Sequence, residues 1–392
     1  QLCPHPTFAP MADAPDAAPD PPADLAPVAV PVHRMARRQS LEKALWELQC
    51  DGPVVGIVHA QEAGCILTCT AQQLTVWDQQ SHAVRRGVRG YSFWQALSYA
   101  PDLQCAIMGG RDGMLVLWDI NSGETKRELS CGSAIASLDY AQSLKVVLSG
   151  EENGTVILWD MTRGLQLAVV WCGASVNCLA YWFIAPYITD IPHMHNGEVM
   201  RKLIPATERG TMGRTFLTGD AAFKVTVWDI ETGAQKKVFN CHSHVLVLAV
   251  SPFLGLIAAG EANGRVTLWD AEVETVLHRF EGGALRSLHF TSAGDVHGLL
   301  CAESMRLISW DIDTGQFRSR NLKRPSSCSC ASSLCILPTN ESAEGEVESG
   351  LLLVGDSSGL VRALPLGSLE ATRGHDEKRC GDGVRLRSCV RS

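Results

Sequence analysis

The chain has 392 residues, of which 46% are hydrophobic and 19% charged, a composition typical of a packed globular protein. Its formal net charge of −8 argues against general affinity for the phosphates of nucleic acids, so we expect no nucleic-acid partner. The 35 glycines indicate many tight turns.

The two ends of the chain differ in composition from the rest. Residues 1–40 are rich in proline and alanine and hold nine of the 18 prolines, so they cannot bury enough apolar surface to offset their ordering entropy. We expect residues 1–40 to be disordered, and the polar residues 367–392 as well. Residues 1–40 contain no apolar core of a secretory signal, and the 15 cysteines are odd in number. A reduced, cytoplasmic or nuclear setting is therefore expected, with most cysteines as small buried hydrophobes.

Between these ends, a Trp-Asp pair recurs six times at spacings of 41, 41, 69, 41 and 41 residues. Each pair follows a short apolar run, and turn sequences such as ENG precede several of these runs. Turn residues between two apolar runs predict β-hairpins. The pairs, expected to anchor the repeats structurally, are Trp77-Asp78, Trp118-Asp119, Trp159-Asp160, Trp228-Asp229, Trp269-Asp270 and Trp310-Asp311.

This repeat resembles that of the WD-repeat β-propeller family, over residues 41–366. The resemblance implies an all-β, seven-bladed propeller with four strands per blade. Six blades are clear, and a degenerate seventh has Ala363 where the tryptophan would stand. Leu48 precedes His59 by 11 residues, the same offset at which other outer strands precede the next inner strand. We therefore expect residues 41–49 to close the ring as the outer strand of blade 7, which removes an exposed sheet edge.

Residues 165–188 carry no formal charge over 24 positions and could be taken for a membrane span. The repeat register instead assigns them to the outer strand of blade 3 and the inner strand of blade 4. Other outer strands are polar, for example residues 124–129 and 234–239. We therefore expect the edge of blade 3 to be covered.

Two insertions interrupt the repeat. Residues 184–213 account for the 69-residue gap and fall between the first and second strands of blade 4, and residues 338–349 fall at the equivalent place in blade 7. Residues 184–213 are a candidate cover for the apolar outer strand of blade 3. Each insertion is interpreted either as a functional loop or as a tolerated surface insertion.

Sequence motifs for catalysis or metal binding are weak. Gly355–Gly359 matches G-x-S-x-G, but a hydrolase needs this motif between a strand and a helix, whereas here it falls in a predicted hairpin turn. Two His-x-His pairs, His193/His195 and His242/His244, have no partner set for zinc. We expect no catalytic residue, no cofactor and no metal. The resemblance further implies a hydrogen-bonding His, Ser/Thr, turn Asp and Trp in each blade; His242 is assigned to the histidine position, and no blade has the complete set.

Partner-binding residues are expected mainly on the hairpin face, whose turns are mildly acidic and lie near an aromatic group. The alternative is ordinary turn composition with core aromatics. The candidates are Tyr91, Phe93, Trp94, Arg111, Glu152, Glu261 and Glu303, with His193 and His195 in the insertion.

Two functional motifs of the family can be compared with the sequence. None of the Trp-Asp pairs is followed two residues later by arginine, which weakens the interpretation as a cullin–ligase adaptor. Val84–Gly87 resembles the apolar-Arg-Arg-Gly motif of phosphoinositide-binding propellers, so Arg85 and Arg86 are candidate lipid-binding residues; the alternative is a solvated outer strand. We expect a non-catalytic scaffold or adaptor for protein partners within a larger complex, with membrane-lipid binding as the alternative function.

Overall fold

The computed structural model describes the following residues, all within one compact unit formed by residues 39–392: 44–90, 92–182, 214–252, 254–281, 283, 285–293, 296–303, 306–312, 317–321, 331–337, 350–365, and four two-residue strands between 188 and 203. The terminal segments 1–40 and 367–392, expected to be disordered, lie outside the described residues, as does the blade 7 insertion at 338–349.

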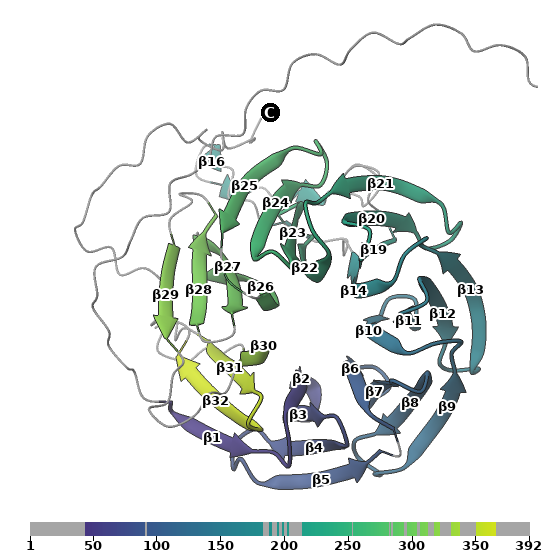
Figure 1. Ribbon diagram of the computed structural model, residues 1–392. Helices are drawn as coiled ribbons and strands as arrows, with labels where there is room; N and C mark the ends of the chain where they lie inside the picture. Colours follow the sequence, from purple (N-terminus) through teal and green to yellow (C-terminus); the bar gives the residue numbers. More distant parts are fainter. Residues whose placement is uncertain are drawn as a thin grey trace, which may run out of the picture. The chain divides into compact units, whose positions relative to one another are not determined.

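The described residues form seven four-stranded antiparallel sheets, numbered here as blades in chain order (Figure 1). Blade 1 consists of β2 (Val54–Ala60), β3 (Cys65–Thr70), β4 (Gln73–Asp78) and β5 (Val84–Arg89). Blade 2 consists of β6 (Trp94–Ala100), β7 (Cys105–Gly110), β8 (Met114–Asp119) and β9 (Thr125–Ser130). Blade 3 consists of β10 (Ile135–Ala141), β11 (Val146–Glu151), β12 (Thr155–Asp160) and β13 (Leu165–Trp171).

The remaining four blades follow the same order from inner to outer strand. Blade 4 consists of β14 (Val176–Trp182), β19 (Thr215–Asp220), β20 (Lys224–Asp229) and β21 (Gln235–Asn240). Blade 5 consists of β22 (Val245–Ser251), β23 (Leu256–Glu261), β24 (Arg265–Asp270) and β25 (Val276–Glu281). Blade 6 consists of β26 (Leu285–Ala293), β27 (Val296–Glu303), β28 (Arg306–Asp311) and β29 (Phe317–Asn321). Blade 7 consists of β30 (Ala331–Leu337), β31 (Leu351–Asp356), β32 (Leu360–Pro365) and β1 (Trp46–Gln49).

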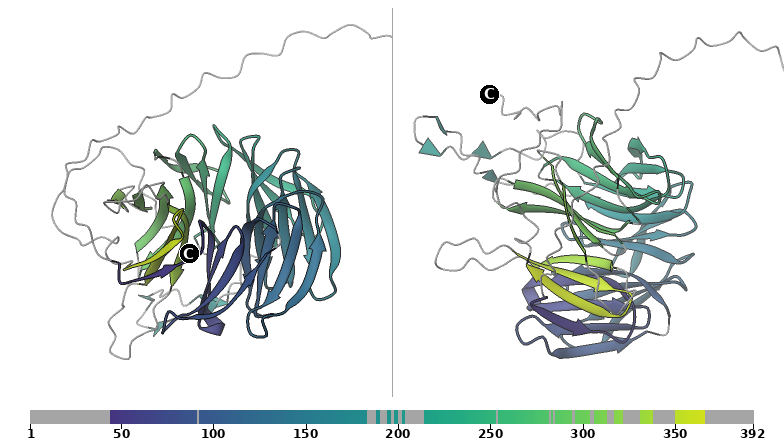
Figure 2. Two further views of the ribbon diagram at one scale, coloured as in Figure 1. Left: turned by 60° about the horizontal axis from the view of Figure 1, so that its bottom comes forward. Right: turned by 60° about the vertical axis from the view of Figure 1, so that its left-hand side comes forward.

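The inner strands contact one another in turn around a ring, and β30 returns to β2 (Figures 1 and 2). The predicted all-β propeller is therefore confirmed. The uncharged stretch enters this ring as β13 and β14, an outer and an inner strand. Within the described part of the chain, no helix has the length and apolarity needed to cross a bilayer.

Blade 7 is built from both ends of the described chain. β1 pairs antiparallel with β32, with Leu48 opposite Val361, and so takes the outer position expected for residues 41–49. The indole of Trp46 also stacks on His82 in blade 1, with ring centroids 4.2 Å apart. β1 thus links the last blade to the first.

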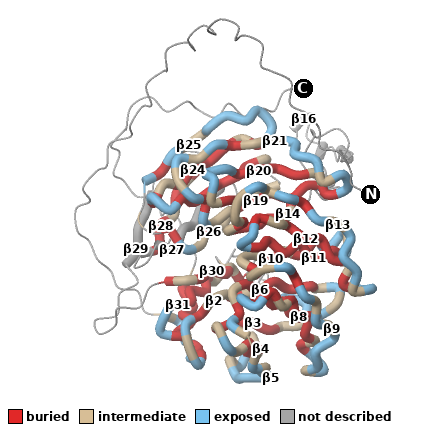
Figure 3. The backbone as a smooth tube through the Cα atoms, turned by 45° about the vertical axis from the view of Figure 1, so that its right-hand side comes forward, coloured by how far each residue is buried: buried red, intermediate tan, exposed pale blue. Residues whose placement is uncertain are grey.

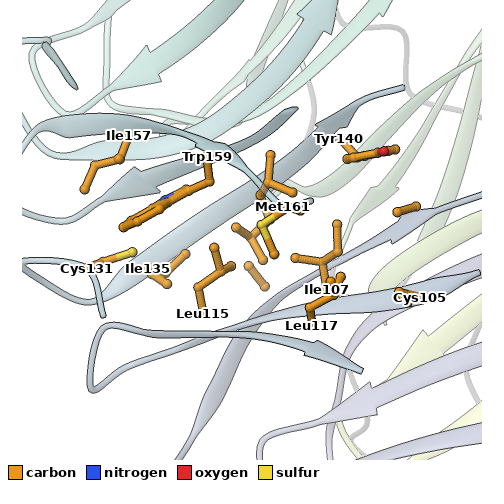
Figure 4. Packing of buried hydrophobic residues seen from close by; sticks show 14 residues of the cluster. Cys105, Ile107, Leu115, Leu117, Cys131, Ile135, Tyr140, Ile157, Trp159 and Met161 are labelled. Atoms are coloured by element: carbon orange, nitrogen blue, oxygen red, sulfur yellow. The ribbon is translucent and has the colours of Figure 1, made fainter. Parts of the chain in front are cut away.

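The core lies between neighbouring blades. Between blades 2 and 3, Trp159 and Met161 of one sheet face Leu115 and Leu117 of the other (Figure 4). The blades approach so closely that a glycine recurs near the end of the second strand, at Gly109, Gly150, Gly219, Gly260 and Gly355. A Cβ atom on Gly109 would lie 2.6 Å from Cγ2 of Ile135 in the next blade, a separation that real Cβ contacts do not show.

The insertion in blade 4 lies between β14 and β19, where the sequence places it. Its described backbone forms two short pairs, β15 (Ile188–Thr189) with β18 (Lys202–Leu203) and β16 (Met194–His195) with β17 (Glu198–Val199). Among the described residues, none of these four strands pairs with β13. Covering of β13 by residues 184–213 stays a prediction.

Candidate functional site

The aspartate of each Trp-Asp pair closes the turn between the third and fourth strands. In five blades one of its carboxylate oxygens accepts the backbone N–H groups two and three residues later. In blade 4, partial burial opposes ionisation of Asp229, but Lys236 at 2.7 Å and the N–H of Thr232 outweigh it and lower its pKa to about 2. These carboxylates are occupied within the blade.

Three of the tryptophans share a second internal arrangement, whereas Trp118 donates to the backbone carbonyl of Gly123 at 3.1 Å. In blade 3, Nε1 of Trp159 donates to Oγ of Ser149 at 3.0 Å, and Sγ of Cys131 lies 3.7 Å from the same oxygen. Blade 1 repeats it with Thr68, which accepts from Trp77 at 2.8 Å and from Cys50 at 3.4 Å. The buried indole N–H of each of these two tryptophans therefore has a hydroxyl acceptor, and a cysteine thiol lies next to the same hydroxyl.

This arrangement corrects the assignment of His242. Cys50, Cys131, Cys172 and Cys241 each lie four residues before the inner strand of the next blade, so the thiol occupies the position that sequence analysis gave to a histidine. His242 is one residue too late, and its backbone N–H donates to Glu261 instead. Burial raises the pKa of the Cys131 thiol to about 11, which keeps it neutral and a poor nucleophile.

The acidic hairpin face predicted from the sequence is largely buried. Glu261 has no exposed surface; its Oε2 accepts from the backbone of His242 at 2.9 Å, and its Oε1 accepts from Thr267 at 3.2 Å. Asp220 and Asp356 are buried as well. The expectation that Glu261 contacts a partner is therefore wrong, because its carboxylate is used inside the blade.

The predicted aromatic group near the hairpin face contains one buried and one exposed residue among those that the structure describes. Trp94 is 5% exposed and packs in the core between blades 1 and 2, so its candidacy as a partner-binding residue is also wrong. Phe93 and Arg111 are exposed and adjacent, since the backbone N–H of Arg111 donates to the carbonyl of Phe93. Glu152 is exposed too. Of the other candidates, Tyr91 and His193 lie outside the described residues, and His195 and Glu303 are described only as backbone in β16 and β27.

A hollow of about 410 Å³ opens at the end of the central channel, on the hairpin face. Residues in or just before the inner strands of four blades and in the β11–β12 turn line it: Ala136, Glu152, Ser175, Asn177, Leu246, Val247, Leu285 and Arg286. Glu152 and Arg286 are exposed and have no ion-pair partner among the described residues, and Leu246 is also exposed. This wall can therefore contact an apolar side chain through Leu246, a basic group through Glu152 and an acidic group through Arg286. Of the sequence candidates, only Glu152 lies in it, and β-strand periodicity did not single out Leu246 or Arg286.

The walls of this hollow are tied together by side chains that reach the next inner strand. Oγ of Ser137 accepts from the backbone of Leu179 at 2.9 Å, and the Asp139 carboxylate accepts from the backbone of Tyr181 at 2.7 Å. Asn177 donates to the carbonyl of Val245 at 2.8 Å. Desolvation raises the pKa of Asp139 to about 6, although the backbone N–H groups of Tyr181 and Tyr140 donate to its carboxylate and favour the charged form. Adjacent blades are thus held in fixed positions around the channel.

The candidate lipid-binding arginines already have protein acceptors. Arg85 pairs with Asp78 and donates to the carbonyl of Ala63 at 2.8 Å, on the wall of a second hollow of about 450 Å³. Arg86 donates to the carbonyl of Ser122 in blade 2 at 2.8 Å. Both guanidinium groups therefore contribute to blade structure. Among the described residues, no group of three or more His, Cys, Asp or Glu side chains is placed to hold a metal ion.

A family model described as "WD domain, G-beta repeat" matches residues 233–270, which run from the end of blade 4 through the Trp-Asp pair of blade 5. No curated protein matches the sequence. The matched segment is about one repeat in length, and the other sheets repeat its four-stranded architecture, all but blade 7 with the same Trp-Asp signature. The family match and the ring of four-stranded sheets together support a WD-repeat β-propeller protein.

Proposed function

We propose that this protein is a non-catalytic interaction scaffold or adaptor, which holds protein partners within a larger complex. The observation that carries the proposal is the hollow at the channel mouth, where exposed Leu246 lies among the charges of Glu152 and Arg286. An apolar contact surrounded by charges suits a peptide segment, because burial supplies affinity and the charges supply orientation.

The seven sheets would act as one closed support, with β1 holding the ring shut. A wall whose strands are already tied by Ser137, Asp139 and Asn177 loses little conformational entropy on binding. Free, buried thiols among the described residues fit a cytoplasmic or nuclear setting.

The test is affinity purification of the full chain from native lysate, followed by mass spectrometry. A channel variant carries Leu246→Asp and Arg286→Glu, and a matched control carries Arg279→Glu on the exposed surface of β25. Partners that bind the wild type and the control, but not the channel variant, support the proposal. If the wild-type chain retains no protein above background, or if all three baits retain the same proteins, the channel mouth is not the binding site.

A further inference from the structure

Phe223 has a backbone conformation that large apolar side chains rarely adopt. It is the third residue of the turn between β19 and β20 in blade 4, and its φ of 68° lies in the left-handed region. The same turn position in blades 2, 3, 5 and 7 holds a glycine, each with a positive φ: Gly113, Gly154, Gly264 and Gly359. The other described non-glycine residues with positive φ are polar or charged: His82, Gln104, Lys145, Arg214 and Glu274.

This turn position also leaves little room for a Cβ atom in other blades. On Gly113 or Gly154, a Cβ would lie 2.8 Å from a backbone carbonyl oxygen of the segment that leads to the next inner strand, closer than real Cβ contacts. Phe223 nevertheless keeps the hydrogen bond that these glycines make, because its carbonyl accepts from the backbone N–H of Cys241 at 2.7 Å. Blade 4 therefore places a phenylalanine where the turn favours glycine. Strain of this kind is typical of residues that contact a ligand.

The ring of Phe223 lies on the surface beside a second ring. The middle strands of a blade are largely buried, as β11 and β12 show in red in Figure 3, but Phe223 at the end of such strands is 43% exposed. Its ring meets the ring of exposed His244 edge-on, with centroids 5.0 Å apart. Nδ1 of His244 donates to the carbonyl of Ala221 at 2.6 Å, in the same turn as Phe223. The two rings therefore form an aromatic pair that is already held in place.

This aromatic pair borders the hollow at the channel mouth. The backbone N–H of Ala221 donates to the carbonyl of Ser175 at 3.0 Å, and Ser175 lines the hollow. On the other side, His244 is two residues before Leu246, which also lines the hollow. Residues two positions apart have Cα atoms no more than about 7 Å apart. A peptide bound in the hollow can therefore reach the pair with a neighbouring side chain.

The exposed charges beside the pair are mainly positive. Lys224 follows Phe223 directly and is exposed, as is Arg286 in the hollow, and neither forms an ion pair with another residue that the structure describes. Asp220, the acid of the same turn, is 2% exposed. The exposed acid of the hollow, Glu152, belongs to the turn of blade 3 instead. An acidic residue next to an apolar side chain therefore complements the blade 4 side of the hollow.

We propose that Phe223 determines partner specificity at the channel mouth. With His244, it binds a large apolar side chain of a partner peptide, while Lys224 pairs with an acidic residue next to that side chain. An aromatic ring fixed before binding loses little conformational entropy in the complex, which makes it an effective anchor. The inference rests on the proposed function and deepens it, because it names the contact residue and the chemistry of the peptide.

The experiment selects peptides from a random library displayed on phage, using the immobilised full-length wild-type chain. The selected peptides are then labelled, and their affinities are measured by fluorescence polarisation. We expect them to share a large apolar residue next to Asp or Glu. Phe223→Gly should bind them about tenfold or more weakly. Val273→Ala is the matched control and should bind like the wild type, because Val273 is an exposed apolar residue in the β24–β25 turn, at the opposite end of the strands.

Two further measurements separate a contact from a structural role. Lys224→Glu should bind the selected peptides weakly, but it should recover affinity for peptides in which the acidic residue is replaced by lysine. The thermal midpoint of Phe223→Gly should not fall, because glycine adopts a positive φ without strain. A variant that loses the peptides but keeps its stability has lost a contact surface rather than its fold.

The outcomes distinguish this inference from the proposed function. If Phe223→Gly binds the peptides like the wild type, while Leu246→Asp with Arg286→Glu does not, the channel mouth binds peptides and the role of Phe223 is overturned. The role is equally overturned if the midpoint of Phe223→Gly falls by more than about 3 °C, or if the selected peptides share no acidic residue. If the wild type selects no peptide above background, the inference and the proposed binding site both fail.

Discussion

Replacing Thr218 by valine tests whether the hydroxyl acceptor of a blade tryptophan contributes to stability. Oγ1 of Thr218 accepts from Nε1 of Trp228 at 2.9 Å inside blade 4, and Thr218 is 1% exposed. Valine keeps nearly the same shape, so little cavity forms and the main effect is a buried indole N–H without its acceptor. Such a group costs about 1–3 kcal/mol of unfolding free energy. Thermal unfolding followed by circular dichroism should show a midpoint lower by roughly 2–8 °C.

The control is Thr226→Val in the neighbouring strand. Thr226 is directly opposite Thr218 in the register, is also buried, and its side chain makes no hydrogen bond to another residue that the structure describes. The same chemical change there removes no acceptor from the indole, so the midpoint should be unchanged or slightly higher. If both variants lose the same stability, the effect comes from the Thr-to-Val change itself, and the reasoning about the Trp228 acceptor is refuted.

Three further predictions concern stability. The pKa of Asp139 is raised from 3.8 to about 6, so between these pH values the folded chain holds a proton that the unfolded chain has lost. The free energy of unfolding should therefore fall as pH rises from about 4 to about 6. In Asp139→Asn, the thermal midpoint should not show this fall with pH. Lys236→Met should cost at most about 1 kcal/mol and less at high salt, whereas Asp229→Asn should cost more by urea denaturation, since it weakens the turn as well as the ion pair. Gly109→Ala should cost about 1–3 kcal/mol of unfolding free energy, because its Cβ overpacks the contact between blades 2 and 3. Gly132→Ala should be near neutral by the same assay, because its Cβ would lie 3.6 Å from Oε2 of Glu151, an ordinary van der Waals distance.

The strands could be predicted because their signals are local in sequence. Apolar runs, turn residues and the 41-residue spacing of Trp-Asp fix where each hairpin lies, and the offset of Leu48 was enough to place the closing strand opposite Val361. The direction in which a turn side chain points, by contrast, depends on residues that are distant in sequence. Glu261 looked like a surface acid, but its carboxylate reaches an N–H group contributed by the loop from the preceding blade.

The thiol position shows a different limit of the sequence. His242 was assigned to the histidine position of the repeat because of its residue type. The position four residues before the inner strand is instead that of Cys241. That spacing recurs at Cys50, Cys131 and Cys172, so the signal was present in the sequence but required comparison among the chain's own repeats. The hollow could not be inferred in this way, because it depends on which inner-strand residues of four separate blades come together at the channel mouth.

The bulged residue of the outer strand differs in charge from blade to blade. In blades 1, 2 and 4 the bulged residue of the outer strand is basic and pairs with the aspartate of Trp-Asp, as Arg85, Lys126 and Lys236 do. In blades 3 and 5 the bulged residue is a leucine, Leu167 or Leu277, and the cation beside Asp160 is Arg163 at 3.8 Å. Among the described residues, these two blades therefore lack the ion pair by which a basic outer-strand residue reaches back to the aspartate of Trp-Asp.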